Sequence, residues 1–247
     1  MNTPQDERIM SLAAALRYPF RGRGWHRRIL ILALAQFIPV VGQLVLLGYG
    51  QEIVRSVYAG ETALPAIHWM RALRDGGLFC LAGLLYLTPI VPLLSKLFVA
   101  DVVLGFLGIT LPPDSAATLV IRGLVNAALA LFGGLIIIGL HVGGVRHALG
   151  DRTGLIVATS NARLLVKHRA LSGRLILNVL LIGLAAVITV GLGAVLLILP
   201  GLYLLVSYSL ALWYLFACYG LTVRIHEPNT VPEGSLGHGW LHRLLRR

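Results

Sequence analysis

Four long stretches of this sequence contain no Asp, Glu, Lys or Arg, and this feature limits the fold more than any other. The stretches are residues 29–51, 76–95, 123–145 and 175–223. A helix needs roughly 20 apolar residues to cross the hydrocarbon core of a bilayer, and three of the stretches have about that length. The fourth is much longer and is divided by Pro200-Gly201, so it predicts two helices.

The apolar stretches favour helices over a membrane barrel. Hydrophobic residues make up 57% of the chain and charged residues only 13%, whereas globular domains average about 25% charged residues. The stretches are continuous, while barrel strands alternate apolar and polar residues. A helix also satisfies its backbone hydrogen bonds within one segment, as lipid requires. The sequence therefore predicts an all-α, polytopic transmembrane helical bundle.

The predicted organisation is a single integral membrane domain over residues 1–225, followed by a flexible basic tail over 226–247. An amphipathic interfacial helix is expected at 5–17, and a second at 65–74, because a proline such as Pro65 suits a first helical turn. The hydrophobic segments are expected at about 29–50, 76–95, 122–145, 174–199 and 201–223.

The basic residues indicate which side of the membrane each connection faces. Arginines and lysines concentrate before residue 29, in 50–75, in 142–174 and after 223. Such segments remain in the cytoplasm, so both termini are predicted to be cytoplasmic. The net charge of +11 flanks apolar stretches, which indicates a bilayer with anionic headgroups as the partner and not nucleic acid.

Five simple crossings cannot place all of these basic segments on one side. The first hydrophobic segment contains Pro39 and Gly42 near its centre, where proline interrupts helical hydrogen bonding and glycine accepts a tight reversal. The sequence therefore predicts four crossings plus a broken, re-entrant first segment. The alternative is one kinked span that departs from the charge rule.

Two parts of the chain repeat the same order of residues. Gly48 precedes Arg55 by seven positions, and Gly139 precedes Arg146 by seven. A further glycine follows each arginine, at Gly60 and Gly150 respectively. Each copy predicts the end of a span, a basic in-plane helix and the next span. Chance similarity between apolar helices is the alternative.

The first third of the chain carries several short motifs. These are Arg17-Tyr18-Pro19-Phe20, Gly48-Tyr49, Arg55, Gly60-Glu61, Leu64-Pro65 and Asp75-Gly76. With them the chain resembles an uncharacterised family of prokaryotic polytopic membrane proteins, known only as a domain of unknown function. The resemblance implies a location in the prokaryotic plasma (inner) membrane and no established chemistry. Family members typically have acidic residues after the Leu-Pro pair, where this chain has Ala66, Ile67 and His68.

Polar side chains inside apolar segments are the default places to look for function. The candidates are Gln36, Gln43, Asn126 and His141, and the candidate helix breaks are Pro39, Gly42, Pro200 and Gly201. The alternative for the glutamines is that they hydrogen-bond the backbone broken around Pro39. For Asn126 and His141, the alternative is a hydrogen bond between helices.

Motifs of catalysis are missing from the sequence, which has no H-E-x-x-H, G-x-S-x-G or P-loop. We therefore expect no enzyme, cofactor or metal site. The favoured prediction is a non-enzymatic membrane accessory or assembly protein that contacts lipid, a protein partner or a second copy of itself. The alternative is a small-solute transporter or channel subunit with a water-accessible cavity lined by Gln36, Gln43 and Asn126.

Overall fold

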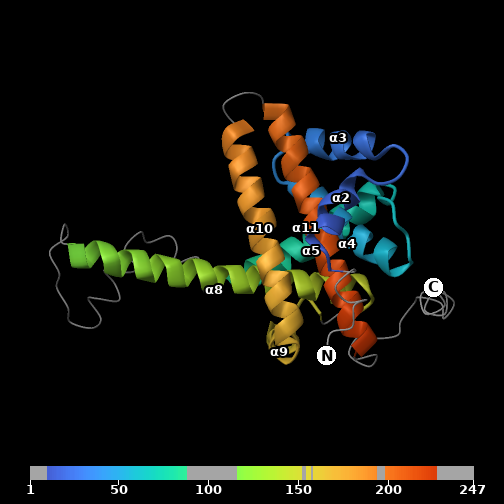
Figure 1. Ribbon diagram of the computed structural model, residues 1–247. Coiled ribbons are helices and arrows are strands. Elements are labelled where there is room, and N and C mark those ends of the chain that lie inside the picture. Colours follow the sequence, from blue (N-terminus) through green and yellow to red (C-terminus); the bar gives the residue numbers. More distant parts are fainter. Residues whose placement is uncertain (1–9, 88–115, 152–153, 157, 194–197, 227–247) are drawn as a thin grey trace.

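A computed structural model describes residues 10–87, 116–151, 154–156, 158–193 and 198–226 (Figure 1). Every regular element in these ranges is helical, which confirms the all-α prediction. The elements are α2 (Leu12–Arg17), the short 3₁₀ helix η1 (Tyr18–Phe20), α3 (Trp25–Ala35), α4 (Val41–Tyr58), α5 (Trp69–Leu87), α8 (Ala116–Ala148), α9 (Ala158–Lys167), α10 (Arg169–Gly193) and α11 (Ile198–His226).

Helix α11 is the centre of the packing. It lies beside α10 and also contacts α4, α3, α2 and α8 (Figure 1). Its Trp213 is 1% exposed, and Gly50 of α4 lies so close that a Cβ there would be 2.1 Å from the indole. Burying such an aromatic side chain is among the largest contributions to a core. The core is therefore built around the middle of α11.

Helices α4 and α5 pack with their backbones in close approach. A Cβ on Gly48 would lie 1.8 Å from the carbonyl oxygen of Ala72, and one on Gly76 would lie 1.8 Å from that of Leu44. Only a residue without a side chain fits at these two positions. Two of the sequence motifs, Gly48-Tyr49 and Asp75-Gly76, thus contain the contact points of this helix pair.

The first hydrophobic segment forms two helices that meet at a sharp reversal. Helix α3 ends at Ala35 and α4 begins at Val41, with Pro39 between them. Val40 has a φ of 67°, a value that a β-branched residue rarely adopts. Gly42 lies against the end of α3, where a Cβ would be 2.3 Å from the Ala35 carbonyl oxygen.

Helix α5 differs from the sequence prediction at its start. A separate helix at 65–74 was expected, but residues 61–68 are not helical and α5 runs from Trp69 without interruption. The physical reason is that side chains from other helices bind the carbonyl groups of Ala63, Leu64 and Pro65. Residues 88–95 of the predicted segment lie outside the described part.

The last two hydrophobic segments form α10 and α11. The sequence placed the division at Pro200-Gly201, but α11 begins at Ile198, so both residues lie in its first turn. A proline is tolerated there because the first-turn N–H groups have no intrahelical acceptor. Of the predicted helix at 5–17, residues 10–17 are described, and only Leu12–Arg17 form a helix, α2; the tail beyond residue 226 lies outside the described part.

Two stretches, Arg169–Thr189 and Leu199–His226, are long and apolar enough to cross a membrane. Helix α10 also exposes apolar side chains along one face: Leu177, Leu180, Leu181, Leu184, Val187 and Ile188, between 42% and 71% exposed. Figure 1 shows α8 lying across α10 and α11 and not alongside them, unlike the simple bundle that was predicted. Its contacts involve its C-terminal part, where Gly144 allows Phe79 and Trp213 to approach closely.

The repeated glycines end α4 and α8 in the same way. At Gly60, φ is 81°; its N–H donates to Val57 O, and the N–H of Glu61 donates to Ser56 O, each over 3.0 Å. This pattern is a Schellman cap, in which a left-handed residue satisfies the last carbonyl groups of a helix. The Ser56 hydroxyl additionally donates to the Glu61 carboxylate over 2.6 Å.

The cap of α8 has the same hydrogen bonds. Gly150 has a φ of 100°; its N–H donates to His147 O over 3.0 Å, and the Asp151 N–H donates to Arg146 O over 3.1 Å. Arg146 also pairs with the Asp151 carboxylate at 2.6 Å. The two caps align Arg146 with Ser56, so the equivalent of Arg55 is Val145. The sequence repeat, which paired Arg55 with Arg146, is therefore shifted by one residue.

Candidate functional site

A non-helical loop between α4 and α5, residues 59–68, is held by side chains from distant parts of the chain; we call it the clasped loop. The Tyr49 hydroxyl donates to Pro65 O over 2.7 Å, and the Arg28 guanidinium donates to Leu64 O. Tyr49 lies on α4 and Arg28 on α3. The hydrogen bonds thus satisfy carbonyl groups that no helix or strand pairs.

The N-terminal segment adds a third contact to the clasped loop. Tyr18 donates to Ala63 O over 3.4 Å, and a Cβ on Gly22 would be 2.6 Å from that of Ala63. Burial is the main cause that raises the pKa of the Tyr18 phenol far above its usual value, with the neighbouring Tyr49 adding to the shift. The phenol therefore stays protonated and remains a donor.

A charge network lies at the junction of α4 and α5. Asp75, with its side chain 2% exposed, pairs with Arg55 at 2.6 Å and with Arg74 at 3.0 Å. Glu52, 7% exposed, lies 3.6 Å from Arg55 and 3.4 Å from Arg71. Buried carboxylates are costly unless paired, and each of these two has two guanidinium partners. Arg74 is 70% exposed, so its ion pair with Asp75 contributes little to stability.

The network also reaches the end of α8. Arg55 Nε donates to the carbonyl oxygen of Ala148 over 3.2 Å, in the last turn of that helix. The amide of Gln51, which is fully buried, donates to the Asp75 carbonyl oxygen over 3.1 Å. The charges and amides therefore join the consecutive helices α4 and α5 to α8, which is distant in sequence.

A second polar cluster holds α9 against the cap of α8. Arg146 donates to Asn161 Oδ1 over 2.9 Å and to Ser160 Oγ over 2.5 Å, in addition to its ion pair with Asp151. Asn161 is fully buried and donates in turn to Gly154 O over 2.9 Å. Arg146, 14% exposed, thus ties the helix cap, the following turn and α9 together.

The two glutamines predicted as candidates take different positions. Gln36 donates to Leu32 O over 3.2 Å and to Gly42 O over 3.0 Å, across the break between α3 and α4. These are the backbone hydrogen bonds that the alternative interpretation expected. Gln43 is exposed on the first turn of α4.

His141 lies among aromatic rings. Its ring centroid is 4.8 Å from that of Phe216, 5.0 Å from Trp213 and 5.3 Å from Phe79. Its Nδ1 lies 2.8 Å from the carbonyl oxygen of Ile137, one turn earlier in α8. In this setting the ring packs between helices, and no acid or base among the described residues contacts it.

The candidate polar positions do not form one site. Gln36 and Gln43 are at the α3–α4 break, His141 is in the aromatic core, and the side chain of Asn126 lies outside the described part. A small, partly open pocket lies elsewhere, between α4, α8, α9 and α11. Its lining residues are Tyr58, Val142, Val145, Arg146, Leu164, Tyr219, Gly220 and Val223.

Sequence reasoning did not identify the charge network or the clasp. The sequence motifs were the available signal, because they contain the residues of both features. Tyr18, Tyr49 and Leu64-Pro65 belong to the clasp, and Arg55 and Asp75 belong to the charge network. A pattern of motifs shows which residues matter locally, but it does not show which carboxylate faces which guanidinium. The pairing depends on how α4 and α5 turn around the clasped loop.

These features define an all-α protein whose apolar helices are tied together by buried ion pairs and a clasped connection. A family model shows to which family the chain belongs. The chain belongs to the family described as Protein of unknown function (DUF4013), whose model matches residues 31–199. No curated protein and no solved structure matches the chain.

Proposed function

We propose that this protein is an integral membrane protein of a prokaryotic plasma membrane and that it acts without catalysis, as an accessory or assembly protein. The observation that carries the proposal is at the α3–α4 reversal. Its tip exposes Leu34, Phe37, Ile38 and Val40, between 48% and 68% exposed. Contiguous apolar surface of this kind is characteristic of contact with a membrane or a partner.

The re-entrant path of the first hydrophobic segment has support from the clasped loop. Arg28 and Tyr18, before the segment, contact Leu64 and Ala63, after it. A single crossing would separate these residues by the hydrocarbon thickness, about 30 Å. A hairpin that enters and leaves on one side keeps them together, with the apolar tip in the lipid.

The four remaining hydrophobic segments, about 76–95, 122–145, 174–199 and 201–223, are proposed as crossings, with the N- and C-termini in the cytoplasm. This topology requires α8, which lies across α10 and α11 in Figure 1, to turn alongside them in the bilayer. The exposed apolar face of α10 supports a crossing for the third segment, because lipid tails are as apolar as these side chains. Its basic first turn agrees with a cytoplasmic start.

The accessory role is supported by where the buried charges point. Glu52 and Asp75 both pair with Arg55, and Arg55 also bonds the end of α8, so these charges hold helices together. Catalytic groups would instead converge on a cavity that admits a substrate. We propose anionic lipid headgroups as one partner, together with a membrane protein or a second copy of this chain. The transporter alternative stays a prediction from the sequence.

Labelling of single cysteines from either face of the membrane tests the topology. In a background with Cys80 and Cys218 replaced by Ala, Gly24→Cys and Thr62→Cys should both react from the same side, which the distribution of arginines predicts to be the cytoplasmic one. Thr159→Cys serves as the cytoplasmic reference and Leu199→Cys as the reference for the outer side. If positions 24 and 62 react from opposite faces, the segment crosses the membrane and the re-entrant model is wrong.

Reconstitution separates the accessory role from the transporter role. In proteoliposomes, an accessory protein should leave the leakage and exchange of small ions and solutes at the level of protein-free vesicles. Flux that saturates with solute concentration would establish transport and contradict the accessory role. The Gln36→Leu variant would then show whether the α3–α4 break lies on the path.

A further inference from the structure

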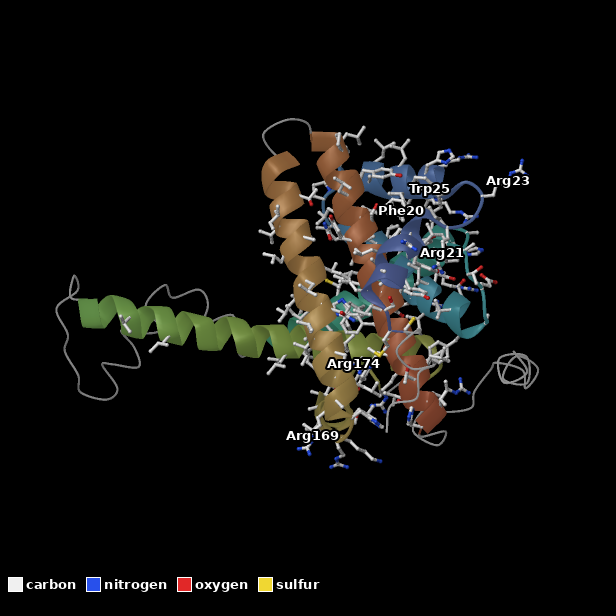
Figure 2. The ribbon with its side chains drawn as sticks, in the orientation of Figure 1. Phe20, Arg21, Arg23, Trp25, Arg169 and Arg174 are labelled. Atoms are coloured by element: carbon white, nitrogen blue, oxygen red, sulfur yellow. The ribbon has the colours of Figure 1, made fainter. Side chains whose placement is uncertain are left out.

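We infer that α9 and the first turn of α10 bind the anionic headgroups of the cytoplasmic leaflet. This inference rests on the membrane location proposed above. The surface, called here the basic foot, consists of Arg163, Lys167 and Arg169, all exposed. Figure 2 shows Arg169 at the lower end of α10, far from the N-terminal arginines Arg21 and Arg23.

The helices that carry the basic foot contain no acidic residue in their sequence. Asp151 is the last acidic residue before Glu227, so α9, α10 and α11 contain none. Arg163 and Lys167 are four residues apart and therefore share one face of α9. A cluster of cations at the start of an apolar helix is the sequence pattern that attracts anionic lipid.

Buried hydrogen bonds fix the foot in place. On the opposite face of α9, Asn161 bonds Arg146 and Gly154 O. At the elbow between α9 and α10, the Ser172 hydroxyl donates to Leu165 O over 2.8 Å and lies 3.0 Å from the hydroxyl of Tyr219. A surface held this way loses little conformational freedom when it binds.

Apolar side chains accompany the cations. Val166 on α9 is 75% exposed, and Ile156 in the preceding turn is 73% exposed. An interfacial helix places such residues at the boundary of headgroups and acyl chains while its basic residues reach phosphate. Helix α9 thus has a buried polar face, which docks on α8, and an exposed face with both lipid-binding components.

The position of the basic foot favours a bilayer as its binding partner. The exposed apolar face of α10 begins at Leu177, about two turns after Arg169. Cations followed along one helix by an apolar face match the order of headgroup and acyl chain in one leaflet. Figure 1 shows α9 nearly end-on at the foot of α10, so its axis turns away from that of the apolar helix, as an in-plane helix requires.

A fluorophore at the foot tests the inference. Val166→Cys, in the background without Cys80 and Cys218, is labelled with an environment-sensitive dye and reconstituted in nanodiscs of phosphatidylcholine with increasing phosphatidylglycerol. The emission should shift to the blue, and quenching by acrylamide, which is uncharged, should decrease. Each Lys or Arg near a membrane contributes about 1 kcal/mol, so each removed charge should weaken the phosphatidylglycerol response about fivefold.

The matched variants separate this surface from general charge effects. Replacing Arg163, Lys167 and Arg169 by Gln should abolish the response, whereas Arg21→Gln with Arg23→Gln, a distant basic pair, should preserve it. Free glycerol phosphate at the same concentration should not reproduce the shift, because the apolar residues need a bilayer. If the emission is identical in neutral and anionic nanodiscs, the inference is wrong. A label that stays shielded in every lipid and in the triple variant would indicate a protein occupant and also overturn it.

Failure of the inference can be distinguished from failure of the proposed membrane location. Extraction of native membranes at alkaline pH leaves integral proteins in the pellet. Release of the protein by this treatment would contradict both the proposed function and this inference. If the protein stays in the pellet but shows no phosphatidylglycerol response, only the inference about the basic foot is contradicted.

Discussion

Arg55 and Asp75 face each other across α4 and α5, with 2.6 Å between Nη2 and the carboxylate oxygen Oδ2. The carboxylate is almost wholly buried, and the same guanidinium reaches the last turn of α8 through its Nε. One arginine therefore compensates a buried charge and joins a third helix. We therefore expect substitutions at this pair to destabilise the protein more than substitutions elsewhere in the charge network.

Asp75→Asn should destabilise the protein by about 2–3 kcal/mol. Breaking a buried ion pair costs about 3–5 kcal/mol, and the partial exposure of Arg55, 27%, reduces the cost. The matched control is Arg74→Gln, because Arg74 also pairs with Asp75 but is 70% exposed, so less than about 1 kcal/mol is expected. Unfolding monitored by circular dichroism in detergent measures both. Equal losses of unfolding free energy in the two variants would contradict the conclusion that Asp75 is held mainly by Arg55.

Gly48→Ala should separate α4 from α5. The new Cβ would lie 1.8 Å from Ala72 O, so backbone must move, and the cost should reach or exceed the upper end of the roughly 1–3 kcal/mol typical of overpacking. Gly77→Ala is the control, since a Cβ there meets nothing within 4 Å and gains up to about 1 kcal/mol of helix propensity. The thermal midpoints should move in opposite directions. A tolerated Gly48→Ala would show that the helices are farther apart.

Much of the helical arrangement follows from the sequence. The length of the charge-free stretches predicted α10 and α11, and the proline at position 39 predicted the interruption of the first stretch. These predictions depend only on local composition and on backbone dihedrals. They succeed because no distant contact is needed to decide them.

The other features depend on contacts that periodicity does not encode. The motif Leu64-Pro65 has the local pattern of a helix start, but Tyr49 and Arg28 bind the carbonyl groups there and keep the loop extended. The repeat was offset by one residue because arginine was matched with arginine. The caps show that position in the last turn, and not residue type, relates Ser56 to Arg146.

Asn161→Ala should release α9 from the cap of α8. The fully buried amide bonds both Arg146 and Gly154 O, and leaving buried partners unsatisfied costs about 1–3 kcal/mol. The bonds from Arg146 to Ser160 and from Ser172 to Leu165 O remain. The effect should therefore be local, with faster trypsin cleavage after Arg163 and Lys167 at an unchanged global unfolding midpoint. Ala162→Ser, on the exposed side of the same helix, is the control. Unchanged cleavage in Asn161→Ala would show that α9 is held by other contacts.

Tyr49→Phe should loosen the clasped loop without disturbing α4. The hydroxyl donates to Pro65 O over 2.7 Å, and its loss should cost about 1 kcal/mol while the ring keeps its packing. Amide hydrogen exchange should accelerate in residues 59–68, and Arg28→Gln should add to this because it removes the donor to Leu64 O. Tyr203→Phe, which removes a phenol half-exposed on α11, is the control and should leave exchange in the loop unchanged. If exchange in the loop is the same in Tyr49→Phe and Tyr203→Phe, the phenol does not hold the loop. In that case the bonds from Tyr18 to Ala63 O and from Arg28 to Leu64 O hold the loop without Tyr49.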